Sequence, residues 1–269
     1  MFPKFSQGIK KTFQHRPNDG DDLHDWQQFQ YWYASSLGKR LAESEKDILD
    51  KYLPDLFGYF LVQCGCPEIK SEKSAGSWLN SSRVSTRYCV DHKKNQGVSF
   101  QSYFDQLPMK SDSIDIMILP HVLEFSSNPH QVLREIERVL IAEGHVVILG
   151  FNPWSIWNIT RLFLFWTKQA PWNAQFFSAH RITDWLALLG FDVVQRQAYF
   201  FKPPIQSEQI SIKMAFLEKL GQRFWPNLGA GYVLVARKRV QTLTPIRPSW
   251  RKQRQVVTGG LETINRNKM

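Results

Sequence analysis

The chain has 269 residues, of which 43% are hydrophobic and 22% are charged, and its formal net charge is +10. This composition is that of a chain with a packed core, which excludes an intrinsically disordered protein. The length favours one domain with additions over two full domains. No uninterrupted apolar run reaches the roughly 18 to 20 residues that a bilayer-spanning helix needs.

The N-terminal residues 1–22 are polar and rich in turn formers, so we expect them to be loose. They contain no apolar run like that of a secretion signal, and the cysteines are few and odd in number: Cys64, Cys66 and Cys89. Both features predict a reducing, cytoplasmic setting. No second cysteine pair completes a zinc site with the first two, so buried structural thiols are favoured over a metal.

Alternating runs of apolar and amphipathic sequence predict an α/β protein. Helices are expected over residues 26–52, 128–140 and 182–189. Strands are expected over residues 59–65, 87–90, 98–102, 114–119, 145–149, 193–200 and 232–236. The last two strands are close enough in sequence to form an antiparallel edge pair.

The segment 114–149 is the clearest unit, because it predicts a strand, a crossover helix and a second strand. Its first run is short and isoleucine-rich, as expected for a strand buried on both faces. Asn128 is a suitable N-cap, Pro129 suits the first helical position, and Gly144 ends the pattern. Such a unit belongs to a parallel sheet with a right-handed crossover.

Several short motifs follow one another across this unit. Gln106-Leu-Pro108 and Ser111–Asp115 come first, followed by Val122-Leu-Glu-Phe125, Leu133-Arg-Glu-Ile136 and Gly144. In this order they resemble the second half of a class I S-adenosylmethionine-dependent methyltransferase. The resemblance implies a Rossmann-like fold across residues 23–238, with a seven-stranded, mostly parallel sheet and helices on both faces.

The resemblance also implies where S-adenosylmethionine would bind. The residues it places around the cofactor are Gln63, Gly65, Cys66, Asp91, Tyr103, Leu119, Pro120 and His121. Asp91 would accept hydrogen bonds from the ribose hydroxyls, and His121 is a candidate general base. Three of these residues have a structural alternative. Asp91 would then be a surface aspartate, Tyr103 a packing aromatic, and His121 a histidine that packs in the turn or caps the next helix.

The glycine-rich turn departs from the family pattern at Pro67 and Ile69. Proline supplies no backbone N–H, and isoleucine resists a left-handed conformation. The first functional hypothesis is a methyltransferase with a small aromatic or lipid-like acceptor. The altered turn supports an alternative, a non-catalytic methyltransferase-like module that binds a partner. A dehydrogenase is disfavoured, because no Gly-x-Gly-x-x-Gly turn follows a predicted strand.

Two inserts and a tail complete the chain. The insert 151–177 is rich in aromatic residues, and a second insert spans 202–226. The first predicts a satellite core, a lid in which Trp154 and Trp157 contact the substrate, or a membrane-surface contact. Residues 239–269 carry seven Lys or Arg against one Glu, which indicates a flexible basic tail. The tail either binds nucleic acid or anionic lipid, or only aids solubility.

Overall fold

The computed structural model describes residues 19–67, 77–93, 97–158, 160, 171–204, 223, 225 and 227–239. Residues 240–269 of the predicted tail, most of the second predicted insert and residues 159 and 161–170 of the first therefore lie outside the described residues. None of the described helices is both long and apolar enough to cross a bilayer.

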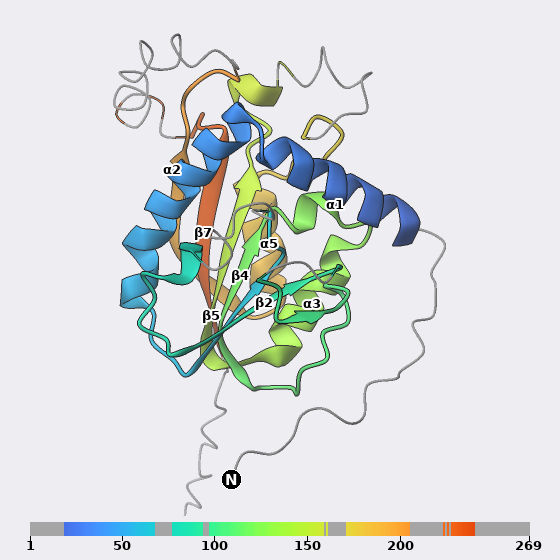
Figure 1. Cartoon of the computed structure of the whole chain (residues 1–269). Helices are drawn as coiled ribbons and strands as arrows, with labels where there is room; N and C mark the ends of the chain where they lie inside the picture. Colours follow the sequence, from blue (N-terminus) through green and yellow to red (C-terminus); the bar gives the residue numbers. More distant parts are fainter. Residues whose placement is uncertain are drawn as a thin grey trace, which may run out of the picture.

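Seven strands form one sheet in the order β3-β2-β1-β4-β5-β7-β6 (Figure 1). Their bounds are β1 Phe60–Cys64, β2 Thr86–Asp91, β3 Phe100–Gln101, β4 Ile114–Pro120, β5 Leu140–Phe151, β6 Phe191–Tyr199 and β7 Gly231–Lys238. The pairs among β1 to β5 are parallel, whereas β7 runs antiparallel to both β5 and β6. The predicted mostly parallel sheet, with its antiparallel edge pair, is confirmed.

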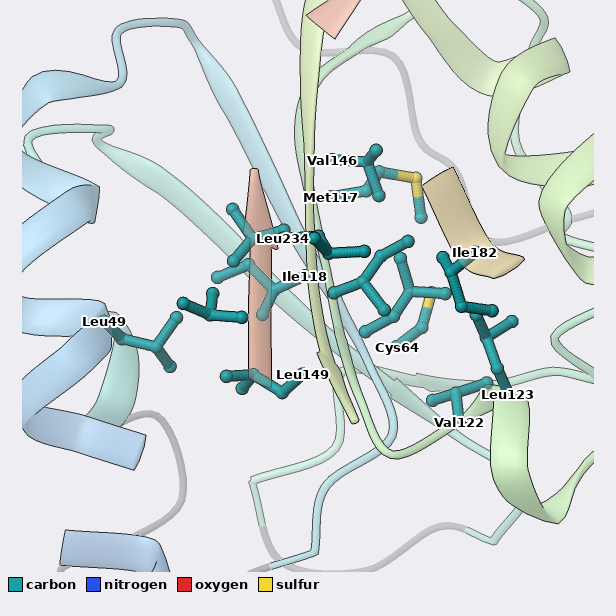
Figure 2. Packing of buried hydrophobic residues seen from close by; sticks show 14 of the residues in the cluster. Leu49, Cys64, Met117, Ile118, Val122, Leu123, Val146, Leu149, Ile182 and Leu234 are labelled. Atoms are coloured by element: carbon teal, nitrogen blue, oxygen red, sulfur yellow. The ribbon is translucent and has the colours of Figure 1, made fainter. Parts of the chain in front are cut away.

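Helices cover both faces of this sheet. They are α1 Asp19–Tyr33, α2 Ser36–Tyr52, α3 Pro129–Val139 and α5 Ala179–Leu188, with short 3-10 turns η1 Leu53–Asp55, η2 Ser77–Leu79 and η3 Leu123–Phe125. Figure 2 shows Leu49 of α2 on one side of the strands and Ile182 of α5 on the other. Both side chains are fully buried in the common core. The central strands are therefore shielded from water on both faces, as their apolar runs predicted.

The predicted helix over 26–52 is in fact two helices. The chain turns at Ser35, whose side chain accepts a hydrogen bond from the N–H of Gly38 and so caps α2. Gly38 is required here, because a Cβ would lie 2.5 Å from the backbone oxygen of Tyr33. Only Ala34 and Ser35 separate the aromatic residues of α1 from the amphipathic pattern of α2, so the sequence alone did not locate the break. The break lets α1 lie across the end of the sheet while α2 packs along one face (Figure 1).

Helix α1 begins at Asp19, inside the segment predicted to be loose. Residues 1–18 lie outside the described residues, so the prediction is wrong only for its last part. The physical reason is tertiary contact: the carboxylate of Asp22 accepts a hydrogen bond from the N–H of Ser127 at 2.8 Å. Burial of Trp26 and Phe29 fixes the next turn of the helix. Tertiary packing thus overrides the weak local helix propensity.

The strand–helix–strand unit matches its prediction except at the two ends of its helix. Helix α3 starts at Pro129 as expected, but the side chain of Asn128 makes no capping hydrogen bond. The helix ends at Val139 and β5 begins at once, so Gly144 lies within the strand rather than at the helix end. A Cβ at Gly144 would lie 2.9 Å from the backbone oxygen of Ile141, so the glycine allows a close backbone approach there.

Lys238 at the end of β7 ties this strand to the crossover helix. Its Nζ donates to the backbone oxygens of Glu137 and Leu140 at 2.7 and 2.9 Å. Lys238 is only 8% exposed, so the two backbone oxygens that it bonds have little access to water. We expect Lys238→Met to lower the free energy of unfolding by about 1 to 3 kcal/mol, because buried acceptors lose their donor.

The neighbouring Arg239 is the matched control. It forms ion pairs with Asp192 and Glu143, but all three side chains are largely exposed. Arg239→Ala should therefore cost less than about 1 kcal/mol. Urea denaturation of the two variants checks the pair of values, and equal losses would contradict the role given to Lys238.

Candidate functional site

The structure brings most of the predicted cofactor residues together at the carboxyl ends of β1, β2 and β4. Gly65 follows β1, and its N–H donates to the oxygen of Val90 at 2.7 Å. The next N–H, that of Cys66, donates to Oδ2 of Asp91 at 3.0 Å. His121 follows the last residue of β4, and its N–H donates to Leu149 of β5 at 2.9 Å. This edge is where ligands bind in open α/β sheets.

Gly65 needs to be glycine for two reasons. Its φ is +85°, in the left-handed region that side chains avoid. A Cβ there would also lie 2.8 Å from the indole ring of Trp26 and 3.0 Å from Val122. Pro67 is buried two residues later, and Ile69 lies outside the described residues. The turn therefore has the glycine that a ligand-binding turn needs, but an indole ring from α1 lies against it.

Asp91 is the most heavily hydrogen-bonded carboxylate of the site and is only 1% exposed. Its Oδ1 accepts from the indole N–H of Trp26 at 3.0 Å and from the N–H of His92 at 2.6 Å. Its Oδ2 accepts from the Gln30 amide and from the N–H of Cys66, both at 3.0 Å. Burial raises the pKa of Asp91 to about 6, although the backbone donors and Trp26 act in the opposite direction. The structural alternative of a surface aspartate is excluded by this burial.

The cysteines differ from their prediction. Cys66 and Cys89 form a disulfide with their Cα atoms 6.8 Å apart, so only Cys64 is a free, buried thiol. The expectation of three thiols is therefore wrong for this pair. Gln63 of β1 lies opposite Cys89 of β2, and the turn after β1 then places Cys66 beside it. The 23-residue separation of the two cysteines gives no local signal of this contact. Within the described ranges, no group of three His, Cys, Asp or Glu side chains could hold a metal ion.

A cavity of about 260 Å³ lies next to Asp91, between the end of β2 and the turn after β4. Tyr103 and Asp105 line one side, and Phe125 and Asn128 line the other. Trp26 of α1 forms part of the wall. The volume is slightly below the roughly 300 to 1,000 Å³ of typical small-molecule sites. The predicted adenine-side residue Tyr103 thus faces the cavity, but the cavity is only part of the expected site.

These observations test whether the residues present fit S-adenosylmethionine. The chemistry is suitable, because a positive-φ glycine, a carboxylate at the end of β2 and a cavity beside Tyr103 stand together. The geometry is not suitable, because the oxygens of Asp91 are already engaged and an indole ring lies against Gly65. In the conformation described, the residues do not accommodate the cofactor.

His121 lies at the centre of a buried charged cluster. The residue is 0% exposed, with φ at +57°. Its Nε2 lies 2.7 Å from Oε1 of Glu45, and its Nδ1 lies 3.5 Å from Oε1 of Glu124. Glu45 also accepts hydrogen bonds from the hydroxyls of Tyr33 and, at 2.9 Å, Tyr199. Burial alone would lower the pKa of His121, but the two carboxylates outweigh it and raise this pKa to about 9.

The role of Glu45 was not predicted from the sequence. It lies in a charged stretch of α2 that is typical of a solvated helix face. One signal was present, because Glu45 is four residues from both Leu41 and Leu49, which are buried. Positions four apart share a helix face, so this carboxylate had to lie in the core. Buried carboxylates require partners, and His121 and the two tyrosines provide them.

The two tryptophans predicted to contact substrate lie in different surroundings. Trp157 is 1% exposed and packs on Phe151, Trp172 and Phe200, and its indole N–H donates to the oxygen of Lys202 at 3.0 Å. Trp154 is 75% exposed. The satellite-core interpretation therefore describes Trp157, while a substrate contact for either residue stays a prediction. Residues 161–170 of the same insert lie outside the described residues.

Comparisons with known proteins give a consistent result. A family model described as a methyltransferase domain matches residues 79–148. The uncharacterized protein YafS of Escherichia coli is 31% identical over 232 residues, which is 83% of this chain and 87% of that protein. The uncharacterized protein MJ1123 of Methanocaldococcus jannaschii is 25% identical over 116 residues, 42% of this chain and 56% of that protein.

Solved structures show the same fold. A SAM-dependent methyltransferase of Thermotoga maritima aligns with a TM-score of 0.57 and 17% identity, over 80% of this chain and 100% of that chain. An S-adenosylmethionine-dependent methyltransferase of Mesorhizobium loti aligns with a TM-score of 0.51 and 14% identity, over 71% and 96% respectively. At these identities the likeness shows the architecture alone.

Proposed function

Because the chain belongs to the class I S-adenosylmethionine-dependent methyltransferase family, we propose that it methylates a small aromatic or lipid-like acceptor. S-adenosylmethionine is the cofactor that family and fold assign to it. The predicted family resemblance is thereby confirmed, whereas the acceptor is our proposal. The conformation described does not accommodate this cofactor.

The observation that supports an apolar acceptor is the wall of rings around His121. The ring of Phe151 lies 4.2 Å from the imidazole and 5.0 Å from the ring of Phe176, measured between centroids. Phe151 ends β5, next to the predicted cofactor residues Leu119 and Pro120 of β4. Phe29 of α1 lies over this wall, 5.3 Å from the imidazole. Flat, apolar molecules are the class that such a wall binds best.

His121 has a different role here from that of a ready general base. With its pKa near 9 it carries a proton at neutral pH, between two carboxylates. We propose that its charge holds Glu45 and Glu124 in place at the end of β4, as a positioning residue. The catalytic role predicted from sequence stays a prediction, because it requires this cluster to rearrange first.

The proposal is tested by methyl transfer from labelled S-adenosylmethionine to a panel of phenols and isoprenoid-like alcohols. The variant Phe176→Ala removes one ring that is only partly buried. We expect its KM for an apolar acceptor to rise about tenfold, because most of the contact area of one ring is lost. Phe57→Ala is the control, since that ring is 67% exposed. An unchanged KM together with an altered cofactor affinity would contradict the assignment of these rings to the acceptor.

The alternative function, a non-catalytic module that holds a partner, has its own support. Pro67 departs from the family turn, and α1 engages Asp91 in the conformation described. This alternative requires that S-adenosylmethionine and S-adenosylhomocysteine do not bind at any physiological concentration. Nucleic acid or an anionic membrane as partners of the tail, and a cytoplasmic location, remain predictions, as the tail from residue 240 lies outside the described residues.

A further inference from the structure

Helix α1 inserts one face into the site. Trp26, Phe29 and Gln30 are spaced three and four residues apart, so they project from the same side of the helix. All three are nearly fully buried. Gln30 also donates to the backbone oxygen of Cys66 at 3.1 Å, in the turn after β1. The helix thus contacts both the turn and the carboxylate that the family uses for its cofactor.

The hydrogen bonds to Asp91 show direct competition. An ionised carboxylate has about four lone-pair sites. Part of this capacity is taken by backbone N–H groups of Cys66, His92 and Lys93, which follow the ends of β1 and β2. The side chains of Trp26 and Gln30 take two further sites. A pair of ribose hydroxyls needs acceptor sites of this kind, and only the two held by α1 can be vacated without breaking the sheet end.

The space is taken as well as the hydrogen bonds. The indole of Trp26 lies so close to Gly65 that a single methyl group would not fit between them. The ring of Phe29 lies 5.3 Å from the imidazole of His121 and 4.6 Å from the ring of Phe125. The helix therefore covers both the glycine turn and the ring wall proposed for the acceptor.

Two polar side chains hold the first half of α1, whereas Tyr33 at its end is buried next to the turn and donates to Glu45. Asp22 is bonded to the N–H of Ser127, and Asp25 to the side chain of Asn173. At its other end, α1 meets α2 through the short turn around Ser35. A hinge at the end of an element is the usual place for a helix to swing as a unit.

We propose that α1 is a removable plug, and that S-adenosylmethionine binds only after α1 swings away from Asp91 and Gly65. This inference rests on the proposed function. The same movement uncovers the ring wall, so donor and acceptor sites open together. The apparent dissociation constant of the cofactor is then the intrinsic constant divided by the fraction of molecules in the open state.

The sign of a mutational effect tests the plug. Gln30→Ala removes two hydrogen bonds that exist only when α1 is docked, one of them to a carboxylate. We expect it to tighten binding of S-adenosylhomocysteine by about 10- to 100-fold in calorimetric titration of the full chain. Gln28→Ala is the matched control, because it is the same substitution on the same helix, and among the described residues the Gln28 side chain bonds only to the exposed His24. It should leave the affinity unchanged.

Hydrogen exchange supplies a second measurement that does not depend on the variant. Ligands usually protect the segments that they contact. Here, saturating S-adenosylhomocysteine should speed exchange of the amides of α1, while those of β1 and β2 become slower. The opposite result, protection of α1 together with weaker binding by Gln30→Ala, would overturn the plug and make α1 a wall of the site.

The outcomes separate this inference from the proposed function. Binding by the wild type that Gln30→Ala leaves unchanged overturns the plug but keeps the methyltransferase. Binding by Gln30→Ala alone supports the plug, with a closed state that dominates in the wild type. If neither protein binds at millimolar ligand, α1 is a permanent part of the core, and both the plug and the methyltransferase proposal fail.

Discussion

Replacement of Glu45 by alanine is expected to lower the free energy of unfolding by about 3 to 5 kcal/mol. The carboxylate is fully buried and bonded to His121, Tyr33 and Tyr199. Its removal leaves a buried imidazole without its nearest counter-charge and two hydroxyls without their acceptor. Loss of one partner of a buried pair costs far more than the pair contributes, because the remaining group keeps its desolvation cost.

Urea denaturation at neutral pH measures this loss, and the same helix provides the control. Glu43→Ala replaces an exposed glutamate two residues away and should change stability by less than about 0.5 kcal/mol. Glu45→Gln keeps the shape but not the charge, and should fall between the two. A loss below about 1 kcal/mol for Glu45→Ala would mean that the cluster is not closed to water as described.

The second large effect is a loss of stability at alkaline pH. The pKa of His121 is raised from 6.5 to about 9 in the folded state. A histidine with a raised folded pKa contributes stability that is complete below its unfolded pKa and lost as pH rises through the folded value. Between pH 6.5 and 8.5 we therefore expect the free energy of unfolding to fall by about 2 kcal/mol.

Other groups with shifted pKa values act mainly outside this window. Burial lowers the pKa of His145, which affects stability at lower pH. Burial raises the pKa of Asp91 to about 6, so its effect on stability lies mainly below the window. Burial also raises the pKa of the Cys64 thiol above its usual value, so the effect of Cys64 lies above the window. His121→Asn should give a less stable protein with a flatter profile. A wild-type profile as flat as that of the variant would show that His121 does not hold its proton.

The strand–helix–strand unit at 114–149 was predictable because its information is local. Buried parallel strands are short apolar runs, and the helix between them carries its own amphipathic pattern. The grouping of Gly65, Asp91 and His121 came from the family resemblance, which assigns these positions to the ends of the predicted strands. Local pattern also explains the error over residues 26–52, because only two residues separate the aromatic residues of α1 from the amphipathic pattern of α2.

The contents of the site were not predictable, because they depend on contacts between distant segments. Trp26 and Asp91 are separated by 65 positions, and Glu45 and His121 by 76. No local sequence pattern indicates that α1 bonds the carboxylate of Asp91, which was expected to bind a ribose. The helix was expected before the first strand, but its position over Gly65 appears only in three dimensions.

Equilibrium dialysis of the full chain against labelled S-adenosylmethionine tests the central claim most directly. The claim is that the edge formed by β1, β2 and β4 is a working cofactor site that α1 closes. We expect saturable binding of one molecule per chain, displaced by S-adenosylhomocysteine and not by NAD. Absence of binding at millimolar ligand by both the wild type and Gln30→Ala, in proteins that unfold cooperatively, would contradict the claim and leave α1 as a fixed part of a non-catalytic module.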